Sequence, residues 1–317
     1  MKSKQKYVRK AKVVAVVLLY YILCVTMGFA TKYFISENGY NFRYPIFKTG
    51  INNLVHFVCA VIYIEYNKKR EHSRAVGKRY LLETLLCSFI GSIDSSISMY
   101  TLRQVELAFY TILKSATPIF IVLSGFVLGT ESVNFSTLFS ILLIAVGTYL
   151  VTVKPIPTAS RDIYLLLSSA IISGFRWSLI QFIITRRNDD IFVAIRDLCL
   201  PTSIFLFAYT SWVHSYREIF SSEFFESVWS ALLNSSLIFG MGIISFLILF
   251  CELWIVKETS VLFLSISAVV KELVIVGISI LNGATCMTKL NYLGIAISII
   301  GIIFYNTVKH TGTKYLN

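Results

Sequence analysis

Long apolar stretches recur along the chain and are separated by short polar connections. Ten of them are long enough, at about 20 residues each, to cross the hydrocarbon core of a bilayer as helices. A bilayer offers no hydrogen-bonding partner to backbone groups, so helices that satisfy their own backbone are expected. The pattern therefore predicts an all-α membrane protein. The predicted spans are residues 13–34, 45–64, 81–101, 105–128, 133–153, 163–185, 191–212, 231–255, 260–281 and 289–308.

Composition argues against a soluble body of any size. Charged residues make up 15% of the 317 positions and hydrophobic residues 56%, and the mean hydropathy is +0.72. A soluble domain usually carries about 25% charged residues. The spans leave almost no chain for an extramembrane domain, so we expect a single transmembrane domain over residues 1–317.

The net charge of +12 would suggest a nucleic-acid partner if the chain were soluble. The basic residues instead gather in two short segments, residues 2–12 and 68–79, which flank apolar spans. This arrangement is typical of cytosolic loops that face anionic lipid. We therefore expect contact with the lipid bilayer and none with nucleic acid. An even number of spans places both termini on one side of the membrane, and the bias of lysine and arginine predicts that this side is the cytosol.

Glycine spacing indicates an internal repeat. Gly129 and Gly147 stand near the end of the first half of the chain, and Gly283 and Gly301 repeat their spacing in the second half. Each half holds an odd number of spans, so the two halves would insert upside down relative to each other, as in many transporters. We predict two inverted five-helix repeats, at residues 12–153 and 162–308.

A lysine lies in the middle of the fourth predicted span. Burying a charge there costs at least ~2.5–3.5 kcal/mol, which makes the residue a functional candidate. Tyr110, Thr111 and Ser115 share a polar face with Lys114 at helical spacing. Pro118 has no N–H to donate to the carbonyl of Lys114. The polar face suits a water-filled cavity that receives an anion.

The ninth predicted span carries a second lysine, Lys271, one turn after Ser267. Lysine is a flexible point charge that can follow a phosphate while a carrier changes state. The alternative is a structural ion pair with Glu252, Asp94 or Glu272. Because Lys114 stands at a comparable depth in the other half, we favour solute binding for both lysines.

Four further polar residues in the spans are candidates with two interpretations each. Arg176 either holds a phosphate through two hydrogen bonds or neutralises Asp94 or Glu252. Gln181 stands close to Arg176 on the same span. Asn52 and Asp94 either contact the base or sugar of a solute or link helices through hydrogen bonds. For Glu83 we expect a structural ion pair.

Motifs for covalent or metal chemistry are missing from the sequence. The six cysteines form no C-x-x-C pair, the four histidines are scattered, and no P-loop, D-x-D or paired-histidine pattern occurs. We therefore predict no enzyme activity, no cofactor and no metal. A membrane-embedded transferase would need such groups at the membrane surface, where the loops here are short.

The chain resembles the drug/metabolite transporter superfamily, in the branch that contains triose-phosphate translocators and nucleotide-sugar transporters. Residues 110–120 and 128–131 resemble the fourth helix of that branch, residues 259–272 its ninth, and residues 291–296 the start of its tenth. Residues 174–181 are most similar to the solute carrier 35 subfamily C member 2 group.

The resemblance implies a ten-helix fold of inverted halves, alternating access and exchange of phosphate-bearing solutes. Lys114 and Lys271 match two positions that grip phosphate in triose-phosphate translocators, and the third such position carries Glu272. The chain also has Asn52 where the group suggests histidine, and Met99 where it suggests asparagine.

From these features we expect a secondary antiporter. It would exchange a cytosolic nucleotide sugar for a lumenal nucleoside monophosphate across a Golgi or endoplasmic reticulum membrane. Two alternatives remain: a translocator for phosphorylated sugars or other organic phosphates, and a non-transporting relative with a regulatory role. A homodimer is left open.

Overall fold

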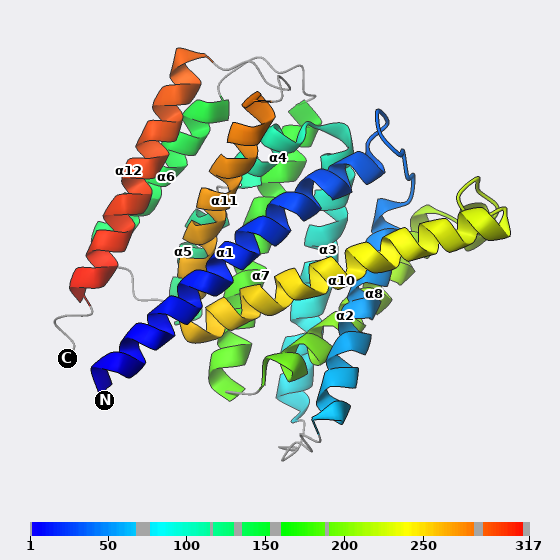
Figure 1. Ribbon diagram of the computed structural model, residues 1–317, viewed down its shortest axis with the longest axis horizontal. Coiled ribbons are helices and arrows are strands. Elements are labelled where there is room, and N and C mark those ends of the chain that lie inside the picture. The colour runs from blue at the N-terminus through cyan, green and yellow to red at the C-terminus, as the bar shows by residue number, and fades with distance from the viewer. Residues whose placement is uncertain are drawn as a thin grey trace. The chain divides into compact units, whose positions relative to one another are not determined.

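The chain is all-helical. A computed structural model describes residues 2–67, 77–114, 117–129, 135–152, 160–187, 190–281 and 288–312, and these residues form helices and no strand. The helices (Figure 1) are α1 (Lys2–Ile35), α2 (Pro45–Tyr66), α3 (Lys78–Gln104), α4 (Leu107–Lys114), α5 (Thr117–Val127), α6 (Phe135–Thr152), α7 (Ser160–Arg187), α8 (Ile191–Val213), α9 (Tyr216–Phe220), α10 (Val228–Glu258), α11 (Val261–Leu281) and α12 (Lys289–Gly312). The predicted all-α class is confirmed.

Many of these helices are long and apolar enough for a bilayer. Six described segments meet that standard, with 22 to 31 residues each, and they fall in α1, α2, α3, α7, α8 and α10. Shorter apolar stretches lie in α5, α6 and α12. The chain is therefore a multi-pass membrane protein. The count of ten spans and the inverted relation of the repeats stay predictions.

Helix α3 is polar on the side that faces the protein and apolar on the opposite side, as expected of a membrane helix. Its serines face the protein interior, as Ser88 at 2% and Ser92 at 6% exposure illustrate, whereas Leu82 is 68% exposed and Phe89 is 49% exposed. The hydroxyl of Ser88 donates a hydrogen bond to the carbonyl oxygen of Leu198 in α8 over 2.9 Å. Polar groups inside and large apolar groups outside match an environment of lipid.

The helices form two compact units. Unit 1 comprises residues 1–103 and 179–260, and unit 2 comprises residues 104–178 and 261–317, so the boundary falls within α7. In unit 1, α2 packs along α8, and α10 contacts α2, α8 and α1. In unit 2, α6 packs along α12, and α11 contacts α4 and α5 (Figure 1). Each unit takes segments from both predicted repeats.

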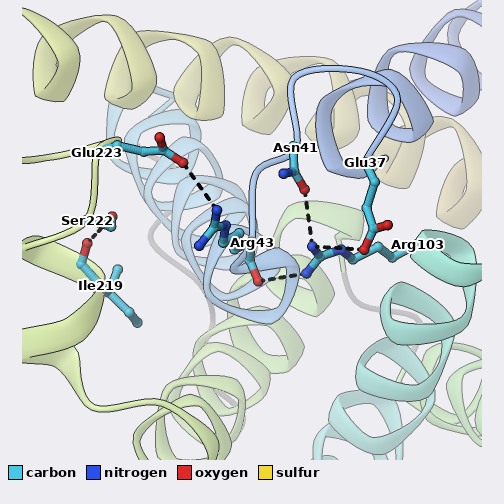
Figure 2. A network of polar contacts seen from close by, with 7 residues as sticks. All are labelled: Glu37, Asn41, Arg43, Arg103, Ile219, Ser222 and Glu223. Atoms are coloured by element: carbon cyan, nitrogen blue, oxygen red, sulfur yellow. Dashed lines mark hydrogen bonds and ion pairs between the residues drawn. The ribbon is translucent and has the colours of Figure 1, made fainter.

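Ionic contacts tie the loop before α2 to the end of α3 in unit 1. The Arg103 guanidinium donates a hydrogen bond to Oδ1 of Asn41 over 3.1 Å and lies 3.7 Å from a carboxylate oxygen of Glu37 (Figure 2). Arg43, in the same loop, lies 3.8 Å from Glu223. Exposed ion pairs contribute little stability on their own, so this network mainly selects a loop conformation.

Aromatic packing holds the same region more firmly. The ring of Phe42 is fully buried, stacks on Phe34 with ring centroids 4.9 Å apart, and meets the edge of Phe224 at 5.0 Å. Aromatic pairs of this kind add to the free energy of simple burial. The α1–α2 loop is therefore anchored to the segment that follows α9.

The fourth predicted span, residues 105–128, comprises α4 and α5 in the part of the chain that the structure describes. α4 reaches Lys114 and α5 begins at Thr117. Pro118 has no N–H for the carbonyl oxygen of Lys114. The Thr117 hydroxyl donates to that oxygen instead, over 2.6 Å. This contact fixes the backbone at the lysine.

α6 and α12 approach each other closely through small residues. A Cβ added at Gly147 would lie 2.6 Å from the carbonyl oxygen of Gly294, and one added at Gly301 would lie 2.9 Å from the backbone nitrogen of Ile144. Gly147 and Gly301 are the equivalent glycines of the predicted repeat, and each faces the other's helix. Small residues permit such backbone contact in membranes.

We predict that Gly147→Ala destabilises the protein by ~1–3 kcal/mol, because the new methyl group must displace the backbone of α12. The matched control is Gly240→Ala in α10, where an added Cβ meets no atom within 4 Å. That change should leave the protein as stable or slightly more stable, since alanine favours helix. Thermal unfolding in detergent measures both, and equal melting temperatures for the two variants would contradict the close α6–α12 contact.

Candidate functional site

An apolar core in unit 2 positions the ninth-span lysine. Ile266 and Val269 of α11 pack with Val122 of α5 and Ile144 of α6 in a cluster whose members are at most 4% exposed. Lys271 follows on α11 and is half-buried. The core therefore fixes the helix on which this lysine stands.

The two candidate lysines meet at one carboxylate. The Glu272 side chain interacts electrostatically with Lys271 and also with Lys114, which ends α4. Helix α4 packs against α11, and the Lys114 side chain is half-buried like that of Lys271. Sequence reasoning predicted a pair of lysines at comparable depth, and both lysines act electrostatically on Glu272.

The environment of Glu272 is unusual for a carboxylate. Its Oε2 atom is buried and accepts no hydrogen bond within the described part of the chain. A buried carboxylate oxygen is normally hydrogen-bonded, and here the nearby positive charges are the compensation. The cluster of Lys114, Lys271 and Glu272, which we call the charge cluster, carries more positive than negative charge and can attract an anion.

Tyr110 stands one turn before Lys114 on α4. It packs with Leu113 against a small core of Val105, Phe109 and Leu166, which leaves its side chain half-buried. Its position on the lysine's helix agrees with the predicted polar face. Ser115, predicted for the same face, lies outside the described residues.

Arg176 lies on α7 between two residues, Gly174 and Ser178, that contact α5 closely. A Cβ at Gly174 would lie 2.9 Å from the backbone nitrogen of Ile121 in α5, and the Ser178 hydroxyl donates to the carbonyl oxygen of Ile121 over 3.1 Å. The Arg176 guanidinium lies 5.1 Å from the ring centroid of Trp177. Unit 2 therefore holds Arg176 together with Tyr110 and the two lysines.

The other predicted site residues belong to unit 1. Asp94 on α3 is 4% exposed, and its Oδ1 accepts a hydrogen bond from Ser98 over 3.4 Å. Asn52 on α2 is 6% exposed. Gln181 on α7 is half-buried. The predicted residues thus fall into two groups, one in each unit.

Sequence reasoning missed a polar column on α2. Lys48, Asn52 and His56 follow one another at one-turn spacing, which places them on one face, and they are 2%, 6% and 7% exposed. His56 Nε2 lies 2.6 Å from the Ser245 hydroxyl. Oδ1 of Asn52 is buried and has no hydrogen-bond partner in the described residues. The one-turn spacing was a signal that could have revealed the column.

Lys48 is the main correction to the sequence interpretation. A count of lysines and arginines on the two sides of the predicted spans places Lys48 outside the bilayer, because it stands near the start of the span at residues 45–64. The structure buries it within unit 1, where the described contact of its ammonium is the Thr31 hydroxyl at 3.4 Å. Removing it from the count increases the bias of basic residues toward the cytosolic side.

Glu83 forms the structural ion pairs that were expected of it. Its Oε1 lies 3.0 Å from Nε of Arg79 and 3.3 Å from the guanidinium of Arg186. Both partners are in unit 1. The structural interpretation of Glu83 is confirmed.

The chain is similar in sequence to known transporters. A sequence model of the Triose-phosphate Transporter family matches residues 11–306. An Arabidopsis thaliana protein named as a sugar phosphate/phosphate translocator is 24% identical over 238 residues, which is 73% of this chain. The match covers 56% of that relative, so the chain spans little more than half of its length.

Two other similarities extend over most of the chain. A Saccharomyces cerevisiae protein named as a nucleotide-sugar transporter is 23% identical, with 93% of this chain and 84% of that protein covered. A crystal structure of another protein superposes with a TM-score of 0.63 at 13% identity, covering 94% of this chain and 97% of the other. At that identity the superposition shows a shared fold.

We predict that Lys48→Met stabilises the protein or leaves its stability unchanged. A buried ammonium without a carboxylate partner is costly, and an apolar side chain of similar length removes that cost. The control is Lys289→Met at the exposed start of α12, which should have little effect. Thermal unfolding in detergent is the measurement. A clear loss of stability in Lys48→Met alone would show that Lys48 has an anionic partner.

Proposed function

Because the chain belongs to the Triose-phosphate Transporter family, we propose that it is an antiporter that exchanges a cytosolic nucleotide sugar for a lumenal nucleoside monophosphate. The coarser assignment, a translocator of a sugar phosphate or a nucleotide sugar, follows the names of its relatives. The finer assignment rests on the charge cluster in unit 2.

The convergence of Lys114 and Lys271 on Glu272 carries the proposal. Both ammonium groups stand on helices of a membrane protein, where an uncompensated charge is costly. A structural ion pair would need one lysine for one carboxylate, and here two lysines interact with the same Glu272. The positive charges of the two lysines can attract a phosphate, and charge-assisted hydrogen bonds to phosphate are among the stronger ones in proteins.

Glu272 also favours a nucleotide sugar over a small sugar phosphate. A compact, doubly charged phosphate is best held by basic groups alone, and the glutamate lowers the net charge of the cluster. A nucleotide sugar spreads its charge over two esterified phosphates and adds a base and a sugar. We assign Tyr110, Asn52 and Asp94 to the base and sugar, with Gln181 beside them, and Arg176 to a phosphate.

Alternating access supplies the mechanism. The two repeats, residues 12–153 and 162–308, would rock so that the site opens first to one side and then to the other. Solute gradients would drive the exchange without covalent chemistry. We place the protein in a Golgi or endoplasmic reticulum membrane, with both termini in the cytosol, and a homodimer is compatible with this mechanism.

A second candidate is the exchange of sugar phosphates for phosphate. The Arabidopsis thaliana relatives favour it, since they are named as sugar phosphate/phosphate translocators; one of them is 22% identical with 94% of this chain covered. The two candidates differ in the need for a nucleotide. Inhibition of uptake by nucleoside monophosphates would support the first candidate, and inhibition by triose phosphates would support the second.

We predict uptake of one nucleotide sugar into proteoliposomes that are preloaded with the matching nucleoside monophosphate. Lys114→Ala and Lys271→Ala should each lower uptake at least about tenfold, because each removes a charged hydrogen bond of ~1.5–3 kcal/mol. The control is Lys289→Ala, at an exposed lysine of unit 2. The assay compares labelled nucleotide sugars with labelled triose phosphates.

Two results would count against this function. Uptake of triose phosphate that does not need an internal nucleotide would favour the second candidate. If folded protein takes up neither nucleotide sugars nor triose phosphates, the result would favour a non-transporting relative with a regulatory role.

A further inference from the structure

Two arginines from different helices share one carboxylate oxygen at one end of unit 1. Oε1 of Glu83 accepts a hydrogen bond from Nε of Arg79 in α3 over 3.0 Å and from Nη1 of Arg186 in α7 over 3.3 Å. The Arg186 guanidinium also lies 5.7 Å from the ring centroid of Phe182, one turn earlier on α7. These contacts hold the two guanidinium groups side by side.

Both guanidinium groups have donors for a further partner. The side chains of Arg79 and Arg186 are 74% and 48% exposed, whereas that of Glu83 is 21% exposed. A guanidinium has five N–H donors in a fixed fork, and the described contact with Glu83 uses one donor of each arginine. Two adjacent, exposed forks match an anion that has several oxygens, such as a phosphate group.

A second carboxylate at this end of unit 1 has partners of its own. Oδ1 of Asp197 in α8 lies 2.9 Å from Nε of Arg196, and Oδ2 accepts a hydrogen bond from Tyr80 over 2.7 Å. Within the described residues, the acid that pairs with Arg79 and Arg186 is Glu83. An anion at the two arginines would therefore contact two guanidinium groups beside one carboxylate.

Helix α3 places the two arginines at a membrane surface. Its 27 residues extend about 40 Å at ~1.5 Å per residue, which exceeds the ~30 Å hydrocarbon core of a bilayer. Arg79 and Arg103, at opposite ends of this helix, therefore fall at opposite surfaces. The predicted topology puts the start of α3 on the cytosolic side, where anionic lipids are concentrated.

An apolar stripe continues from Arg79 along α3. Leu82, Leu86 and Phe89 follow it at helical spacing, and they are 68%, 47% and 49% exposed. A phospholipid fits this arrangement, with its phosphate at the arginines and an acyl chain along the apolar side chains. The stripe therefore favours a lipid over a free phosphate.

We propose that Arg79 and Arg186 form a binding site for an anionic glycerophospholipid. Its phosphate lies between the two guanidinium groups, and its acyl chain packs on the stripe of Leu82, Leu86 and Phe89. Glu83 is a positioning residue that keeps the two arginines together. The site belongs to unit 1, and this inference does not depend on which solute the protein transports.

Native mass spectrometry of the detergent-purified protein tests the site. The protein is titrated with phosphatidylinositol 4-phosphate, phosphatidylserine and the zwitterionic phosphatidylcholine. A fourth titration uses glycerophosphoinositol 4-phosphate, which is the first head group without its acyl chains. The wild type should bind the two anionic lipids at least about fivefold more tightly than phosphatidylcholine. It should bind the soluble head group more weakly than the corresponding lipid, because the stripe then has no acyl chain to bind.

Arg79→Gln and Arg186→Gln should each lower the affinity for the anionic lipids about fivefold, because each removes a basic residue near the head group. Their affinity for phosphatidylcholine should change less. The matched control is Arg43→Gln. Arg43 is also exposed and paired with a carboxylate, that of Glu223, but it lies beside Arg103 at the other end of α3. Arg43→Gln should bind all lipids as the wild type does.

Three results would overturn this inference. The first is equal affinity of the wild type for anionic lipids and phosphatidylcholine. The second is an equal effect of Arg43→Gln and the two test variants, whether all three lower the affinity or none does. The third is binding of the soluble head group as tightly as of its lipid, which would indicate a site for free phosphate compounds.

Discussion

A bilayer gives polar groups no partner, so every buried charge in this protein must find compensation within the protein or in a solute. The apolar surfaces of the helices face outward, and serines, threonines and ionisable groups turn inward. Most inward groups are matched by neighbours, as Ser88 is by the backbone of Leu198. In the charge cluster, Lys114 and Lys271 both interact electrostatically with Glu272. The proposed binding of an anionic solute is based on this arrangement.

Local backbone features position Lys114 and Lys271. Thr117 replaces the hydrogen bond that Pro118 cannot make, which fixes the end of α4 at Lys114. On the other helix, the apolar core shared by α5, α6 and α11 fixes the position of Lys271. The close contact between α6 and α12 through Gly147 and Gly301 completes unit 2. Features that look like packing details thus determine where the lysines lie.

Hydropathy was sufficient to predict the helices, because long apolar runs in a bilayer have few alternatives. It could not predict the local hydrogen bonding at Pro118, where the Thr117 hydroxyl donates to the carbonyl oxygen of Lys114. Lys114 and Lys271 could be selected as candidates from the sequence, because they lie at comparable depth in corresponding spans of the two halves. Lys48 could not, because a lysine near the end of a span looks like a loop residue, and only the structure shows it buried beside Thr31. The electrostatic interaction of Glu272 with Lys114 was equally hidden, because the two residues are far apart in the sequence.

The most direct test of the account is a cryo-electron microscopy structure of the protein with a transported nucleotide sugar bound. The account predicts phosphate oxygens within hydrogen-bonding distance, about 2.7–3.2 Å, of the ammonium groups of both Lys114 and Lys271, with Glu272 beside the same phosphates. Phosphates held elsewhere, with the two lysines still paired to Glu272, would contradict it and would make the charge cluster a structural element.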